Sequence, residues 1–317
     1  MFLPWSEIDP EAKVALTDSR FLSDPDKSIF FAIRGERHDG HRFIPKLYEA
    51  GLREFVVEPG PWPVDVKLIL EREEVRAFVV AKSIEALQAL AAEKRRKFSY
   101  PVVGITGSNG KTIVKEWLSS LLERDFSIVK SPRSYNSQIG VALSVWEMNR
   151  HHTLGLFEAG ISQVGEMHAL EAMVRPSLGI FTNIGSSHSE GFSSDKEKIR
   201  EKLNLFVHAE ALVYCADQHS VAEEIKTYLL PLNPAIRLLP WSLSSIDFDA
   251  GTVEVGGRIW DLPFKDAASL ENVMNCTQAA LYLKPDLDLS ALRFLNPVEM
   301  RLELKEGRED NYLIDDT

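Results

Sequence analysis

Short apolar runs alternate with amphipathic segments along the first hundred residues of the chain. Strands are predicted at 28–35 (SIFFAIRG) and 54–58, because both runs are apolar and rich in aromatic or β-branched residues. The spacing of apolar positions at 41–51 predicts a helix, with Gly51 as its C-terminal cap. The prolines of 59–63 indicate a loop. This alternation is typical of an α/β unit.

From residue 102 the alternation becomes regular. Four near-continuous apolar runs precede or follow helical segments: VVGIT (102–106), LGLFEA (154–159), LGIFTNI (178–184) and ALVYCA (211–216). Such runs, separated by helices, predict a parallel sheet covered on both faces. A hairpin is then predicted over 252–264 with Gly256-Gly257 at its turn, followed by a helix over 269–283.

The pattern divides the chain into an N-terminal domain (1–99), a central domain (100–297) and a short remainder (298–317). A helix predicted from Ile84 to Phe98 closes the first part. Its KRRK end (94–97) favours a solvated last turn, where the helix dipole attracts cations, over a phosphate-binding patch. We expect 298–317 to begin a C-terminal domain that this chain does not complete.

Composition and charge narrow the function classes. The chain has 317 residues, which fits about two domains. Its 36 Lys and Arg against 47 Asp and Glu give a net charge of −11, which disfavours nucleic acid and anionic lipid as partners. Two cysteines, Cys215 and Cys276, are too few for a disulfide framework. Since neither a signal peptide nor a membrane-spanning run is visible, we expect a cytoplasmic protein.

The sharpest chemical signal is the sequence TGSNGKT (106–112), which lies between an apolar strand and an amphipathic helix. Its glycines allow the backbone N–H groups to point at phosphate oxygens, and the helix N-terminus adds positive charge. Lys111 is expected near the terminal phosphates and the Thr112 hydroxyl on magnesium. The strict P-loop spacing is not met, because Ile105 stands where the first glycine belongs. The predicted phosphate loop comprises Gly107, Ser108, Asn109, Gly110, Lys111 and Thr112.

Polar residues follow two of the other apolar runs. Glu158 ends one run, and Asn183 and His188 follow another. Ligands in parallel sheets bind at the C-terminal ends of strands, so these residues and the phosphate loop predict a magnesium–nucleotide site. Lys202 borders a helical apolar stripe, and this pattern alone predicts that its ammonium group reaches water.

Six segments resemble the Mur ligases of cell-wall synthesis, in the branch that adds D-alanyl-D-alanine to UDP-N-acetylmuramoyl-tripeptide. They are TDSR (17–20), FFAIRGERHDGHRF (30–43), GITGSNGKTIVKE (104–116), SYNSQIG (134–140), FEAGISQVGEM (157–167) and FTNIGSSH (181–188). The resemblance implies an N-terminal UDP-sugar-binding domain and a central ATP-binding domain. Parts of it are most similar to ligases fused ahead of an alanine racemase.

The resemblance also implies roles for individual residues. It places Lys111 on the ATP phosphates, Thr112 and Glu158 on one magnesium ion, and His188 on a second. Lys202 matches a lysine that is carbamylated to serve that second ion, so the resemblance makes Lys111, His188 and Lys202 the catalytic residues. Further binding residues are implied: Asn183 and Asn275 near the adenine, Arg301 and Asp316 on the nucleotide, and Ser19, Arg20 and Asn136 on the UDP-sugar peptide.

The sequence departs from the family pattern at Ile113, Ser137, Ala142 and Glu271, the last of which affects adenine recognition. Two other functions stay open at this point. One is a different amide ligase of the superfamily, such as a folylpolyglutamate synthase. The other is a nucleotide-binding module without catalysis.

Overall fold

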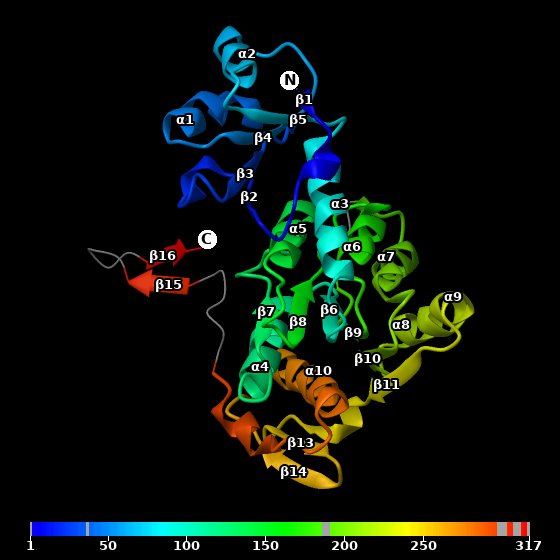
Figure 1. The fold of residues 1–317 in the computed structure, drawn as a ribbon. Helices are drawn as coiled ribbons and strands as arrows, with labels where there is room; N and C mark the ends of the chain where they lie inside the picture. Colours follow the sequence, from blue (N-terminus) through cyan, green and yellow to red (C-terminus); the bar gives the residue numbers. More distant parts are fainter. Residues whose placement is uncertain (1, 36–37, 186–190, 297–302, 307–311, 316–317) are drawn as a thin grey trace.

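The computed structural model describes residues 2–35, 38–185, 191–296, 303–306 and 312–315. Two parallel β-sheets organise the chain, one built from residues before 80 and one from residues after 101 (Figure 1). The first is five-stranded, in the order β1-β5-β4-β3-β2. Its strands are β1 (Phe2–Leu3), β2 (Val14–Leu16), β3 (Ser28–Phe31), β4 (Glu54–Val57) and β5 (Arg76–Val79).

Two helices, α1 (Ile44–Glu49) and α2 (Val64–Leu70), pack on one face of the first sheet. Burial of Phe30, Phe55 and Ala77 against their apolar sides forms a small core. Gly51 follows α1 with φ 99°, as a helix C-terminus requires. Three short 3₁₀ turns complete this part: η1 (Trp5–Glu7), η2 (Ser19–Phe21) and η3 (Gly40–Phe43).

The second sheet is six-stranded and parallel throughout, in the order β11-β10-β9-β6-β8-β7. Its strands are β6 (Val102–Thr106), β7 (Ile128–Lys130), β8 (Leu154–Glu158), β9 (Leu178–Phe181), β10 (Ala211–Cys215) and β11 (Arg237–Trp241). The four apolar runs predicted from the sequence are the four inner strands. The parallel sheet is therefore confirmed, with two more strands at its edges.

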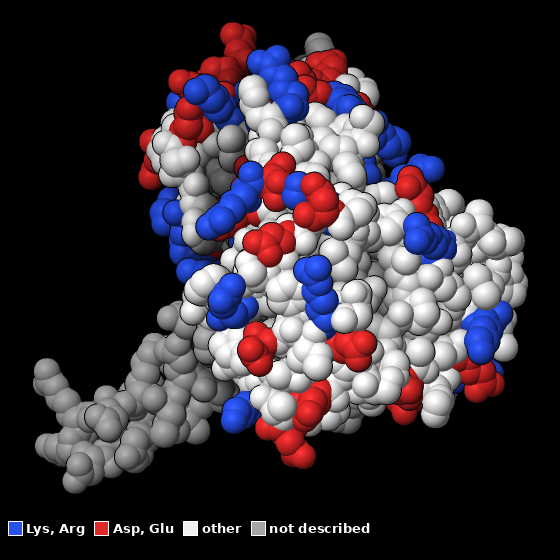
Figure 2. Space-filling view, turned by 90° about the horizontal axis from the view of Figure 1, so that it is seen from below, with Lys and Arg blue, Asp and Glu red and all other residues white. Residues whose placement is uncertain are grey.

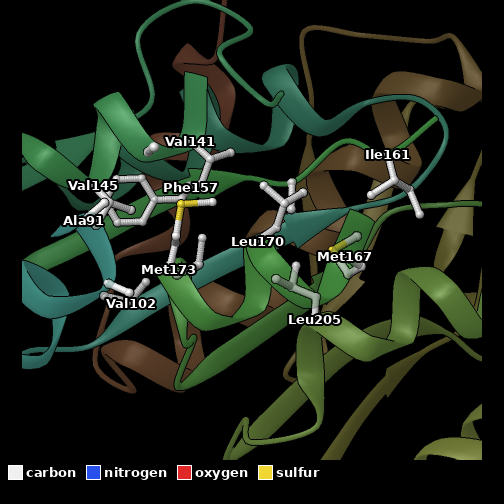
Figure 3. Packing of buried hydrophobic residues seen from close by; sticks show 14 of the residues in the cluster. Ala91, Val102, Val141, Val145, Phe157, Ile161, Met167, Leu170, Met173 and Leu205 are labelled. Atoms are coloured by element: carbon white, nitrogen blue, oxygen red, sulfur yellow. The ribbon is translucent and has the colours of Figure 1, made fainter. Parts of the chain in front are cut away.

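Helices cover both faces of the second sheet. One face packs against α4 (Lys111–Leu122) and α10 (Ala267–Leu283). The other packs against α3 (Ser83–Arg96), α5 (Gln138–Trp146) and α6 (Glu166–Val174). Figure 3 shows this second interface, where Ala91 of α3, Val141 of α5 and Met173 of α6 converge on Phe157 of β8.

The basic end of α3 is half buried: Arg96 and Lys97 are exposed, as the solvated last turn predicts, but the two residues before them are not. Lys94 and Arg95 are 7% and 9% exposed, so the prediction of a solvated last turn is wrong for these two residues. Lys94 donates hydrogen bonds to the carbonyl groups of Pro10 and Trp146, while Arg95 caps the end of α6 through the carbonyls of Val174 and Arg175. Charge-assisted bonds to backbone oxygens offset the burial of both cations.

The remaining elements surround the second sheet. They are α7 (Asp195–Leu203), η5 (Asn204–Phe206), α8 (His219–Glu224), the π-turn η6 (Ile225–Leu229), α9 (Leu230–Leu232), η7 (Leu243–Ser245) and η8 (Leu289–Phe294). An antiparallel sheet contains β12 (Ile246–Asp247), β13 (Thr252–Val255) and β14 (Arg258–Asp261), and β15 (Glu303–Glu306) pairs with β16 (Tyr312–Asp315). The predicted hairpin is confirmed, with Gly256 and Gly257 at φ 61° and 72°.

Acidic and basic side chains are interspersed over the face of the molecule shown in Figure 2. Over the described part of the chain, none of the helices combines the length and apolarity needed to cross a membrane.

Candidate functional site

The phosphate loop lies between β6 and the N-terminus of α4, at the C-terminal edge of the second sheet. Its two glycines have positive φ angles, 144° at Gly107 and 80° at Gly110. A Cβ at Gly107 would lie 2.0 Å from Thr182 Oγ1, and one at Gly110 would lie 2.3 Å from Asn272 Oδ1. Both positions therefore require glycine, for conformation and for space.

The end of β9 forms one wall of this loop. Asn183 accepts hydrogen bonds from the loop backbone, through its side chain from Asn109 N (3.0 Å) and through its carbonyl from Ser108 N (2.9 Å). The hydroxyl of Thr182 donates to the carbonyl of Asn109 at 2.6 Å, and Gly185 N donates to Ser108 Oγ at 2.9 Å. The structure thus brings the predicted residue Asn183 to the loop. It also places Thr182 there, and the position of Thr182 directly after an apolar strand could have indicated this from the sequence.

Lysine side chains gather at the same loop. Lys111 Nζ donates to the carbonyls of Gly107 (3.0 Å) and Ser108 (3.1 Å), and Lys202 Nζ donates to the carbonyl of Gly107 at 3.1 Å. Lys202 is only 2% exposed, so the interpretation that it reaches water is wrong. Burial, together with the repulsion of the nearby ammonium groups of Lys111 and Lys198, lowers the pKa of Lys202 to about 7.

Glu158, at the end of β8, faces the first turn of α4. Its carboxylate is fully buried, and its Oε2 accepts a hydrogen bond from the Thr112 hydroxyl at 3.0 Å. Its Oε1 has no hydrogen-bond partner among the described residues, although the ammonium of Lys115 lies 2.9 Å away in an ion pair. A buried, incompletely bonded carboxylate oxygen beside a hydroxyl is a donor set that suits Mg²⁺.

The described residues contain no group of three or more His, Cys, Asp or Glu side chains arranged to hold a metal. Mg²⁺ is commonly held by one or two carboxylates together with the phosphate oxygens of a nucleotide. Glu158 and Thr112 are the residues that would hold the ion here. His188, the predicted ligand of a second ion, lies outside the described residues.

The structure does not bring all predicted nucleotide residues to the loop. Asn275 is fully buried, donates to the carbonyl of Glu271 at 3.2 Å and accepts from Trp241 Nε1 at 3.0 Å. Its place near the adenine stays a prediction, and Asn272, one turn earlier on α10, is the asparagine that contacts the loop at Gly110. Arg301 and Asp316 lie outside the described residues.

The residues predicted to bind the UDP-sugar peptide come from both parts of the chain. Ser19 and Arg20 lie in η2, where Arg20 forms an exposed ion pair with Asp18 at 2.6 Å. Asp18, and to a smaller extent Tyr135, raise the pKa of Arg20. Asn136, the neighbour of Tyr135, accepts a hydrogen bond from Gly160 N at 2.9 Å, just beyond the end of β8. The predicted substrate residues thus lie in two places, at η2 in the N-terminal part and beside the end of β8, where Glu158 lies.

Residues 105–230 match the model of the Mur ligase middle domain. The chain is 28% identical to the UDP-N-acetylmuramoyl-tripeptide–D-alanyl-D-alanine ligase of Borreliella burgdorferi, over 84% of this chain and 60% of that protein. It is also 28% identical to the ligase of the same name from Bacillus subtilis, over 91% of this chain and 63% of that protein. The chain thus spans about 60% of the length of these curated relatives.

The solved structures agree with this similarity. MurF ligase from Thermotoga maritima, in complex with ADP, superimposes with a TM-score of 0.78 over 98% of this chain and 72% of that chain, at 24% identity. MurF from Acinetobacter baumannii gives the same TM-score over 96% of this chain and 67% of that chain, at 23% identity. Residues 105–230 thus resemble a Mur ligase middle domain, and the chain that contains them has the fold of MurF ligases.

Proposed function

We propose that this chain carries the UDP-sugar-binding and ATP-binding parts of an ATP-dependent ligase of peptidoglycan synthesis. The ligase adds D-alanyl-D-alanine to UDP-N-acetylmuramoyl-tripeptide in the cytoplasm. The observation that carries the proposal is the assembly at one sheet edge of a glycine-dependent phosphate loop, a buried carboxylate and a buried lysine of depressed pKa. The names of the curated relatives supply the substrates.

The reaction suits these residues. The tripeptide carboxylate attacks the γ-phosphorus of ATP, ADP leaves, and an acyl phosphate forms. The amine of D-alanyl-D-alanine then attacks the acyl carbon, so that the amide and inorganic phosphate result and the amine loses a proton. Backbone N–H groups of the loop and the ammonium of Lys111 would bind the phosphates, and Glu158 and Thr112, which are hydrogen-bonded to each other, would hold the ion. Magnesium, when bound, neutralises charge on the phosphate oxygens.

The proposal includes a carbamate on Lys202. A neutral lysine amine attacks carbon dioxide, a C–N bond forms, and a proton is released. Burial and the pKa of about 7 make the neutral form of Lys202 abundant at physiological pH, whereas an ordinary lysine is almost wholly protonated there. The anionic product would offset the positive charges of Lys111 and Lys198 and would serve, with His188, as the site of a second magnesium ion.

Two finer points rest on the sequence motifs. The segments 158–167, 182–192 and 201–206 resemble ligases fused to an alanine racemase, so we include that fusion in the proposal. The alternative of a folylpolyglutamate synthase is not favoured, because both curated relatives reported above join D-alanyl-D-alanine to the tripeptide. A nucleotide-binding module without catalysis would retain the phosphate loop but would have no need for a buried Lys202.

A thermal-shift panel on this chain separates the three functions. We expect ADP with Mg²⁺ and UDP-N-acetylmuramoyl-tripeptide each to raise the melting temperature, because both bind the folded state. Folate is expected to leave it unchanged. If ADP with Mg²⁺ raises the melting temperature but UDP-N-acetylmuramoyl-tripeptide and folate do not, the chain is a nucleotide-binding module without catalysis. If folate raises the melting temperature, the folylpolyglutamate synthase replaces the proposed function.

A further inference from the structure

Lys115 is a fully buried lysine that lies just behind the phosphate loop on α4. Its Nζ lies 2.9 Å from Glu158 Oε1 and 3.1 Å from Glu116 Oε1. It also donates hydrogen bonds to the carbonyl of Ser131, at 2.7 Å, and to that of Arg133. A buried ammonium group persists only when it is paired and hydrogen-bonded, so these four contacts are what keep the charge in place.

The partners of Lys115 belong to different functional parts of the molecule. Glu158 is the carboxylate proposed to hold magnesium, whereas the two carbonyls belong to the loop 131–137 between β7 and α5. This loop runs beside the end of β8, because Glu158 N donates to Ser131 Oγ and Gly160 N donates to the carbonyl of Asn136. One ammonium group therefore joins the metal carboxylate to the loop that carries Asn136.

The backbone of this loop is held in an unusual conformation. Arg133 has φ 48°, a left-handed angle that a non-glycine residue adopts only when its surroundings enforce it. The hydrogen bond from Lys115 to the Arg133 carbonyl is a contact that enforces it. The side chains of Arg133 and Tyr135 in this loop are exposed.

We propose that Lys115 is a positioning residue that transmits occupancy of the magnesium–nucleotide site to the loop 131–137. This inference rests on the proposed function. A divalent cation held by Glu158 and Thr112 repels the ammonium of Lys115. Glu116 cannot take over the ammonium fully, because it also pairs with Lys130. The ammonium consequently tightens its bonds to the loop carbonyls, so that nucleotide binding fixes the loop facing the UDP-sugar peptide.

Hydrogen–deuterium exchange on the whole chain tests this coupling, with peptides that cover 128–140 as the readout. In the wild type, ADP with Mg²⁺ is expected to slow exchange in 131–137 several-fold, and ADP with EDTA is not. Lys115→Gln keeps a hydrogen-bond donor for the loop but removes the charge, so we expect its loop to lose the response to ADP with Mg²⁺. Lys67→Gln removes a charge from an exposed position on α2, whose ion pair is with Glu71, and is expected to respond like the wild type.

A merely structural role for Lys115 predicts a different result. If the Gln variant binds ADP with Mg²⁺ and its loop is protected as in the wild type, the coupling is refuted. If Lys115→Gln does not fold, the wild-type measurement still tests the coupling. Equal protection of the loop by ADP with EDTA and by ADP with Mg²⁺ would refute the coupling. A wild-type chain that binds no ADP under either condition would instead overturn the proposed function, and the coupling with it.

Discussion

Replacing Lys202 by methionine is expected to make the ligand-free fold more stable, although it removes a residue of the proposed active site. The lysine is 2% exposed, and methionine fills a similar volume without a charge. Burial, with the repulsion of Lys111 and Lys198, lowers the pKa of Lys202 from its ordinary 10.5 to about 7. The folded state therefore binds the proton less tightly than the unfolded state does.

The size and the pH range of the effect follow from this difference. Each pKa unit corresponds to about 1.4 kcal/mol, so the lowered pKa of Lys202 corresponds to about 5 kcal/mol of lost stability. The full loss applies at a pH at which Lys202 is protonated in both the folded and the unfolded chain. This cost is complete below pH 7, shrinks as the pH rises between 7 and 10.5, and vanishes above 10.5. The lost hydrogen bond to the Gly107 carbonyl offsets about 1 kcal/mol of the gain. We therefore expect a net stabilisation of about 3–4 kcal/mol at pH 6.

Urea unfolding of both proteins at pH 6, 8 and 10 measures the effect. The buffers must be free of carbon dioxide, because a carbamate would change the charge of Lys202 in the wild type. Lys67→Met removes the same charge from an exposed helical position and controls for net charge. We compare the free energy of unfolding of Lys202→Met with that of the wild type at each pH. If the difference stays constant over this range, Lys202 does not have the lowered pKa on which the prediction rests.

Three further changes are expected to have distinct effects. Lys111→Ala should weaken binding of a fluorescent ADP analogue by about 1.5–3 kcal/mol, the range of a charge-assisted bond, without a change in melting temperature; unaltered affinity would remove Lys111 from the phosphates. Gly107→Ala should abolish that binding, because its Cβ would lie 2.0 Å from Thr182 Oγ1; a variant that binds normally would show that the loop relaxes freely. Arg95→Met leaves three backbone carbonyls without their donor and should lower the free energy of unfolding by about 2–4 kcal/mol in a urea titration; a loss below about 0.5 kcal/mol, the size of a surface change, would contradict that role.

Much of the second sheet was predictable because its inner strands are buried on both faces. Such strands are near-continuous apolar runs, and 102–106, 154–159, 178–184 and 211–216 all stand out. The edge strands β7 and β11 did not stand out. The first has only three residues, and the second is half exposed and contains a proline. Edge strands are only partly covered, so their sequences carry a weaker pattern.

The candidate site was predictable where its chemistry is local. The loop 107–112 and Glu158 follow directly from strand ends and glycine spacing. The burial of Lys202 was not visible, because the helix stripe it borders gives no sign of the phosphate loop that covers it. The roles of Lys115 and Asn272 could not be predicted for the same reason, because the residues that they contact are distant in sequence. Tertiary contacts, rather than local patterns, decide whether a polar residue on an amphipathic helix meets water or a site.

Isothermal titration calorimetry of the wild-type chain with ADP, in Mg²⁺ and in EDTA, tests the central claim most directly. The account predicts one ADP bound per chain in the presence of Mg²⁺ and a clear loss of affinity in EDTA, because Glu158 and Thr112 then have no ion to share with the phosphates. Binding of equal strength in Mg²⁺ and EDTA, or no binding in either, would contradict a magnesium–nucleotide site at this edge of the sheet.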